Sequence, residues 1–230
     1  MKTLKIYIKE SIFDDVDTIT SNDTVLIEQF LKDNYKITGS YIIKGGVVDV
    51  KGDVKVKNRE IESLTNGTFR FGTITKSFDC TNCLKLKSLK GSPKEVGMDF
   101  LCTDCIKLTS LEGTPEKVGG NFYCTNCLRL TLLEGAPEVV GGNFYCAGCS
   151  KLTSLVGAPK KVEGDFWCGG CRGLTSLEGA PKEVGGDFNC SYCSKLTSLE
   201  GAPKKVGGRF WCSNCPDLII TQQDKKKYKI

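Results

Sequence analysis

The sequence predicts a solenoid of the α/β repeat class, in which seven 22-residue coils each carry a short parallel strand behind a small N-terminal α+β cap. Phenylalanine recurs every 22 residues without one insertion, and each copy is followed two residues later by Cys-x-x-Cys. This motif accounts for all 14 cysteines, and six of the seven prolines fall at one repeat position. The repeated phenylalanines are Phe78, Phe100, Phe122, Phe144, Phe166, Phe188 and Phe210.

The apolar pattern assigns each part of a coil. Phe188-Asn-Cys190 alternates with period two, so the phenylalanine and the first cysteine point inward from a short strand, and the residue between them points outward. The second cysteine, Cys193, ends the strand, and Leu196 and Leu199 supply a second inward face. Glycine, proline and the recurring Val-Gly-Gly then turn the chain, since glycine accepts positive φ and proline presets a turn. One coil cannot bury its apolar side alone, so only stacking produces a core.

A degenerate coil precedes the seven regular ones. It aligns Val54 with the phenylalanine, Val56 with the first cysteine and Asn58 with the second. Valine at the first cysteine position indicates a small buried apolar group. Asparagine at the second indicates a side chain that satisfies backbone groups rather than a metal ligand.

The repeat resembles that of a known family. Phe-x-Cys-x-x-Cys-x-x-Leu-Thr-Ser-Leu resembles the cysteine-containing form of the leucine-rich repeat, and its second half is similar to BspA-like repeats, whose usual period is one residue longer. Together with Ser-Leu-Glu-Gly-Ala-Pro-Lys, the pattern resembles repeat proteins predicted from large tailed bacteriophages. The resemblance covers residues 52–220. It implies a leucine-rich-repeat-like solenoid whose second cysteines form a ladder between coils, and it implies a phage-encoded protein in the host cytoplasm or the virion.

The ends differ from the repeats. Residues 1–51 are predicted to form a strand–helix–strand cap, with strands over Leu4–Ile8 and Tyr41–Val50 and a helix over Val25–Asn34 that has N-cap candidates from Ser21 to Thr24. Phe69–Ile74 is predicted to be an irregular coil between the cap and the solenoid, which covers residues 52–220. The Lys-rich tail, residues 221–230, is predicted to be disordered or to form a solubilising cap.

Composition excludes several functional classes. The net charge of +5 is concentrated in the tail, so the Lys and Arg distribution predicts no nucleic-acid partner. No apolar stretch approaches the length that spans a bilayer, and no secretory signal is found, so we expect no membrane partner and a reducing cytosol. The chain has no histidine, and seven Cys-x-x-Cys pairs cannot share zinc ions two by two without a remainder. We therefore expect no metal, no cofactor and no enzymatic activity, with buried thiols preferred over disulfides or metal binding.

The candidate binding residues occupy two outward columns of the predicted strands. One column lies between phenylalanine and the first cysteine, and it holds both tryptophans of the protein. The other lies just before the phenylalanine and carries carboxylates and amides. Exposed aromatic residues are costly unless a partner covers them, and Tyr and Trp are enriched in interface hot spots. The candidates are Asp99, Leu101, Asn121, Tyr123, Asn143, Tyr145, Asp165, Trp167, Asp187 and Trp211.

These columns favour a non-catalytic binding protein whose partner is a host or virion protein. Two alternatives stay open: a module that sequesters a glycan or nucleotide-like ligand by aromatic stacking, and a structural virion component. The aromatic column could also be a ladder that only stabilises neighbouring coils. Mixed charges beside the proline turn, such as Glu116 and Lys117, indicate a solvated convex face.

Overall fold

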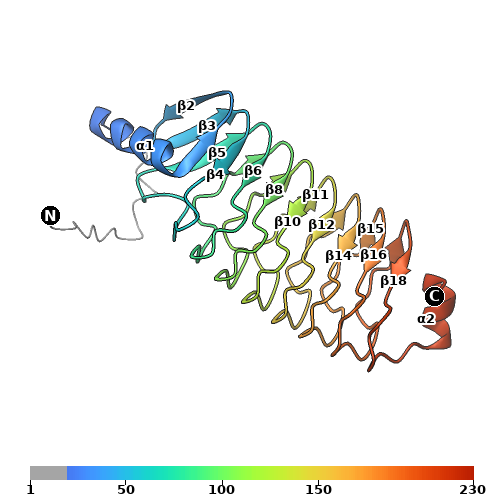
Figure 1. The fold of residues 1–230 in the computed structure, drawn as a ribbon. Helices are drawn as coiled ribbons and strands as arrows, with labels where there is room; N and C mark the ends of the chain where they lie inside the picture. Colours follow the sequence, from blue (N-terminus) through green and yellow to red (C-terminus); the bar gives the residue numbers. More distant parts are fainter. Residues whose placement is uncertain (1–19) are drawn as a thin grey trace.

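The computed structural model describes residues 20–230 and is a β-solenoid with a helix at each end (Figure 1). The coils stack from the N-terminal helix α1 (Ser21–Asn34) to the C-terminal helix α2 (Gln222–Tyr228). The prediction of a solenoid of 22-residue coils is confirmed, and the coil begun by Val54 makes eight turns with the seven regular ones. The predicted strand over Leu4–Ile8 lies outside the described residues.

The strands that begin with phenylalanine form one parallel sheet, called sheet A. The short strand β1 (Tyr35–Ile37) closes its N-terminal edge by pairing antiparallel with β4 (Val54–Val56). Val54 pairs with Phe78, as the alignment of the degenerate coil predicts. The other strands are β6 (Phe78–Asp79), β8 (Phe100–Leu101), β10 (Phe122–Tyr123), β12 (Phe144–Tyr145), β14 (Phe166–Trp167), β16 (Phe188–Asn189) and β18 (Phe210–Trp211).

A second sheet of nine strands, sheet B, is formed by a segment that precedes the sheet A strand of each regular coil by three residues. The valine of the Val-Gly-Gly segment and the residue before it form a strand, for example Glu183–Val184. The prediction that this segment is only a turn was therefore incomplete. A buried valine beside an exposed charged residue is a two-residue alternation, too short to identify from sequence. The strands are β2 (Ser40–Lys44), β3 (Val47–Lys51), β5 (Arg70–Ile74), β7 (Glu95–Val96), β9 (Lys117–Val118), β11 (Val139–Val140), β13 (Lys161–Val162), β15 (Glu183–Val184) and β17 (Lys205–Val206).

Three further sequence predictions are corrected at the N-terminal end. Tyr41–Val50 is not one strand but the hairpin β2–β3, which turns at Gly45 and Gly46 with φ of 52° and 68°. Two glycines with positive φ are what a tight hairpin turn requires. Phe69–Ile74 is not an irregular coil, because β5 pairs parallel with β3 and starts the regular part of sheet B.

Helix α1 begins earlier than predicted. Its N-cap is Thr20, which forms a capping box with Asp23, so the true cap precedes the predicted candidates. Ile27 and Leu31 are buried in the core. The ring of Phe30 packs edge-on against Phe69, with centroids 5.7 Å apart. The helix therefore covers apolar side chains that the first coil would otherwise expose.

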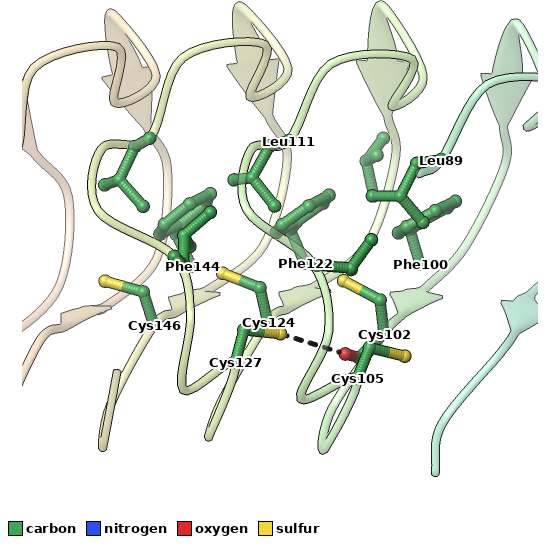
Figure 2. Close-up of a cluster of buried hydrophobic side chains, with 14 of the residues drawn as sticks. Leu89, Phe100, Cys102, Cys105, Leu111, Phe122, Cys124, Cys127, Phe144 and Cys146 are labelled. Carbon is green, nitrogen blue, oxygen red and sulfur yellow. Dashed lines mark hydrogen bonds between the residues drawn. The ribbon is translucent and has the colours of Figure 1, made fainter. Parts of the chain in front are cut away.

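The core consists of columns of identical side chains along the stack. The rings of consecutive phenylalanines from Phe78 to Phe210 have centroids 5.1–5.5 Å apart and planes within 24° of parallel. Figure 2 shows Phe100, Phe122 and Phe144 beside the first cysteines of their coils. The leucine pairs complete the interior, and the glycine that follows each pair has φ between 81° and 92°, as predicted for the turn.

The second cysteines form the predicted ladder. The thiol of Cys127 donates a hydrogen bond to the carbonyl oxygen of Cys102, one coil earlier, at a sulfur–oxygen distance of 3.3 Å (Figure 2). The same bond recurs from Cys105 to Cys215 at 3.1–3.4 Å. In the degenerate coil, the amide of Asn58 instead donates to the side chain of Asn34 at the end of α1. Each of these thiols therefore has a carbonyl partner in the preceding coil, as buried polar groups generally require.

The Lys-rich tail forms a cap. Of the two predicted outcomes, disorder or a cap, residues 222–228 adopt the second as helix α2. The ring of Tyr228 stacks on Phe210 with centroids 4.2 Å apart, and its hydroxyl donates to the carbonyl oxygen of Pro203 at 3.0 Å. Tyr228 thus takes the place of the phenylalanine that a ninth coil would supply.

Candidate functional site

The parallel register of sheet A brings the predicted candidate residues onto one outer face. Tyr123 pairs with Tyr145, Tyr145 with Trp167, and Asn189 with Trp211, so the residues between phenylalanine and cysteine form one column. Trp167 is 38% exposed and Trp211 is 39% exposed, whereas Leu101, Tyr123 and Tyr145 are half-buried. The column therefore points outward as predicted, and its tryptophans expose the most surface.

The rings of this column do not form one uniform stack. Tyr123 and Tyr145 lie nearly parallel, with centroids 4.9 Å apart and 12° between their planes, so each covers a face of the other. Trp167 meets Tyr145 edge-on at 71°. The parallel stacking of the tyrosines therefore does not continue to Trp167, whose side chain is partly exposed to solvent. Simple ladder stacking accounts for the tyrosine pair but not for the orientation of Trp167.

The polar column before the phenylalanines has a structural role that the sequence did not indicate. One side-chain oxygen of each member accepts the backbone N–H of the equivalent residue in the next coil, at 2.6–2.8 Å. In two coils, the other polar atom of the same side chain also forms a hydrogen bond. The Asn143 amide donates to the Tyr145 hydroxyl at 2.8 Å, and the Trp211 indole N–H donates to Asp187 at 3.2 Å. The members of this polar ladder are Asp99, Asn121, Asn143, Asp165 and Asp187.

Asn143→Ala is expected to destabilise the protein by about 1–2 kcal/mol, because the N–H of Asp165 loses its acceptor. Asn143→Asp should keep nearly full stability, since Asp165 and Asp187 make the same bond in their own coils. Urea unfolding of both variants measures the difference. Equal stability of the alanine and aspartate variants would contradict the structural role of the ladder.

Tyr192 is a residue of this face that the sequence analysis missed. It lies between the two cysteines of its coil, has φ of 62° and is 62% exposed. The equivalent position is Asn, Asp or Gly in the other regular coils, the residue types that adopt a left-handed conformation readily. A tyrosine there is strained, and such strain is concentrated at functional sites. The departure from the repeat pattern is the signal that could have identified it.

Small residues lie beside Trp167 on the same face. Its own coil has Gly169 and Gly170 between the cysteines, and the preceding coil has Ala147 and Gly148. No long side chain rises from these four positions, and each of the four residues is half-buried. We call Tyr123, Tyr145, Trp167, Tyr192 and Trp211 the aromatic face.

Electrostatics at the C-terminal end of this face favour a charged carboxylate. The backbone N–H of Arg209 and the indole N–H of Trp211 bond to Asp187 and hold the pKa of its carboxyl group below the ordinary value. The guanidinium of Arg209 lies 5.6 Å from the centre of the Trp211 ring. The face therefore joins aromatic surface to one anion and one cation in its last two coils.

The cysteines are free thiols in surroundings that suppress their reactivity. Burial raises the pKa of Cys83 to about 11 and that of Cys193 to about 12. For Cys80, the hydrogen bond with Cys105 is the largest cause of a raised pKa, followed by burial. Among residues 20–230, no cluster of three or more His, Cys, Asp or Glu side chains is placed to hold a metal ion. Thiols that resist ionisation are poor nucleophiles and poor metal ligands.

Two findings bear on what the chain is. Within the part of the chain that the structure describes, no helix has the length and apolar character needed to cross a membrane. Comparison of the chain with protein-family models, with curated proteins and with solved structures gave no match in any of the three.

Proposed function

We propose that the chain is a non-catalytic binding protein whose aromatic face contacts a protein partner. The observation that supports this most is the exposure of Trp167 and Trp211 on one face of a sheet. A monomer gains nothing from exposing two indoles, whereas a partner that covers them gains burial of large, rigid apolar surface. The small residues Ala147, Gly148, Gly169 and Gly170 carry no long side chain that would keep such a partner away from the backbone next to Trp167.

A catalytic role has little support in this arrangement. The carboxylates and amides of the polar ladder each commit an oxygen to backbone N–H groups, and burial raises the pKa of thiols such as Cys83 and Cys193. The chain contains no histidine that could serve as a general base. We therefore propose that the solenoid acts by binding alone.

The resemblance of the repeat to those of large tailed bacteriophages leads to a narrower proposal. The protein is phage-encoded, belongs to the leucine-rich-repeat class, and meets a host or virion protein in the host cytoplasm or the virion. Sequestering of a planar small ligand is the second candidate, favoured by the edge-on orientation of Trp167, which frees its indole for stacking.

The test removes the aromatic face without disturbing the core. Replacing Tyr145, Trp167 and Trp211 by alanine is expected to abolish capture of a partner in a quantitative pull-down from the native cell. Loss of each indole hot spot weakens binding by about thirtyfold. Val139→Ala, which truncates an exposed apolar side chain on sheet B, is the matched control.

The outcomes separate the candidates. Full capture by the triple variant would overturn the proposed binding face, provided that circular dichroism shows an intact fold. Native mass spectrometry of the purified wild-type protein distinguishes the second candidate. A retained small molecule that is lost in Trp167→Ala would favour ligand sequestering over a protein partner.

A further inference from the structure

The C-terminal edge of sheet A presents backbone donors without acceptors. Within the stack, three backbone N–H groups of each coil donate hydrogen bonds to carbonyl oxygens of the next coil. In the last pair of coils, Phe188 donates to Arg209, Cys190 to Trp211 and Tyr192 to Ser213, at nitrogen–oxygen distances of 2.8–2.9 Å. The equivalent donors of the last coil are the N–H groups of Phe210, Cys212 and Asn214. No acceptor for them is found among residues 20–230. Such an edge is a template for an added strand.

Helix α2 covers the core at this end but not the strand edge. The ring of Tyr228 fills the position of a ninth phenylalanine, as described above. Beside it, a cavity of about 580 Å³ lies between β18 and the C-terminal residues, lined by Phe210, Trp211, Cys212 and Ile220 among others. The space of a ninth strand is thus open, although the place of its phenylalanine is taken.

The surroundings of this cavity are cationic. From residue 204 to the C-terminus the chain has seven lysines and arginines against two acidic residues, Asp217 and Asp224. Arg209 and Lys229 line the cavity itself. The polar ladder ends at Arg209. The five members before it are Asp or Asn, whose side-chain oxygens accept a hydrogen bond from the next coil, whereas the guanidinium of Arg209 can only donate.

We propose that this end of the solenoid is a docking groove for an extended acidic segment of a partner protein, which adds to sheet A as a strand beside β18. Its backbone carbonyls accept from Phe210, Cys212 and Asn214, in the manner of β-strand addition. The groove shares Trp211 and Arg209 with the C-terminal end of the aromatic face but does not include Trp167. Trp167→Ala therefore tests the proposed function alone, and Cys212→Pro tests the groove alone.

Successive side chains of a strand point to opposite faces, and this alternation determines which residue types the partner segment needs. The side chain level with Cys212 points inward toward the cavity and is therefore apolar. The one level with Phe210 meets the Tyr228 ring, which already stacks on Phe210, so it is apolar and smaller than phenylalanine. Side chains level with Arg209 and Trp211 point outward beside the guanidinium and are therefore acidic. Alternation of acidic and β-branched apolar residues satisfies both requirements, and β-branched residues also favour the extended conformation.

The probe is a blocked synthetic peptide of about six residues, the usual length of a strand, with alternating glutamate and valine. A lysine–valine peptide is its charge-reversed counterpart. Isothermal titration calorimetry with the full chain is expected to detect binding of the glutamate peptide alone. Cys212→Pro should weaken this binding about tenfold, because proline removes one edge N–H while remaining tolerated on an edge strand.

Cys212→Val is the matched control, since valine holds the equivalent position of the first coil at Val56 and keeps the N–H. It should bind the glutamate peptide as the wild type does. Arg209→Glu leaves every backbone donor in place and should also weaken binding, which keeps the test decisive if the proline variant folds poorly. Trp167→Ala should leave the peptide affinity unchanged.

Three results would overturn the proposal. The first is the absence of glutamate-peptide binding up to millimolar concentration. The second is equal affinity of the proline and valine variants at position 212. The third is concentration-dependent self-association that Cys212→Pro abolishes, because the occupant of the groove would then be a second copy of this chain.

Discussion

Raising the pH above about 9.5 is expected to unfold the solenoid cooperatively, because its unfolded chain releases thiol protons that the folded core retains. Unfolded cysteine ionises near pH 8.5. In the fold, the pKa values of nine fully buried thiols are raised, that of Cys83 to about 11 and that of Cys193 to about 12. The nine are Cys80, Cys83, Cys102, Cys124, Cys146, Cys149, Cys168, Cys190 and Cys193.

The sign follows from the proton count. Between the unfolded and the folded pKa, the native state binds more protons than the unfolded state, so stability falls as pH rises. The contribution is complete below about pH 8.5. It is lost progressively as the pH rises toward the folded-state pKa of each thiol, about 11 for Cys83 and about 12 for Cys193. Each thiol contributes about 1.4 kcal/mol per pH unit in this window. Nine thiols give about 13 kcal/mol per pH unit, comparable to the whole stability of a typical domain.

Far-UV circular dichroism against pH, with reversal on return to pH 7 under reducing conditions, measures the transition. Cys124→Val is the matched control, because valine occupies the equivalent position at Val56 and cannot ionise. The slope of unfolding free energy against pH should fall by about 1.4 kcal/mol per unit in this variant. A protein that stays folded beyond pH 11, or a slope that the substitution does not change, would contradict the argument.

Native thiol labelling is expected to divide the 14 cysteines into two reactive and twelve protected groups. The twelve cysteines from Cys80 to Cys193 are fully buried, whereas Cys212 and Cys215 are half-buried because no ninth coil covers them. Labelling of a buried thiol requires opening of its coil, so we expect a rate difference of at least about a hundredfold. Burial still raises the pKa of Cys212 and Cys215, so they should react more slowly than free cysteine.

Iodoacetamide labelling at neutral pH, followed by mass spectrometry of the intact chain, counts the thiols modified at each time. Tyr228→Ala is the informative variant, because it removes the ring that covers Phe210. It should accelerate labelling of the last coil and expose Cys190 and Cys193 next, while Cys124 stays protected. Uniform labelling of all coils would show that the solenoid opens as a whole rather than from its end.

The repeat explains how much of the fold was predictable. Phe122, Phe144 and Phe166 are predicted to form a column because they recur every 22 residues. Stacking the coils at equal spacing buries each of these side chains equally. The ladder role of the second cysteine was implied by the resemblance to the leucine-rich repeat and supported by Asn58 in the degenerate coil. The strands of sheet B were not predictable in the same way, since two residues such as Lys161 and Val162 carry too little pattern to separate a strand from a turn.

The candidate face was predictable only in part. Alternation placed Trp167 and Trp211 outside, and the structure has them there. The engagement of Asp165 or Asn143 with the next coil was not predictable, because it depends on how closely two backbones approach. Tyr192 was missed because its position is defined by a backbone angle rather than by burial, and the groove beside β18 was missed because it depends on where α2 ends.

By itself, the sequence determined the period, the identity of the inward columns and the outward position of the tryptophans. These features follow from burial of the same residue types at a fixed spacing, and that spacing can be read directly from the linear sequence. The tertiary structure alone decided which polar side chains bond across coils, how Trp167 turns against Tyr145, and which strand edge stays open. These depend on distances between atoms of different coils, and the spacing of residues along one chain does not contain such distances.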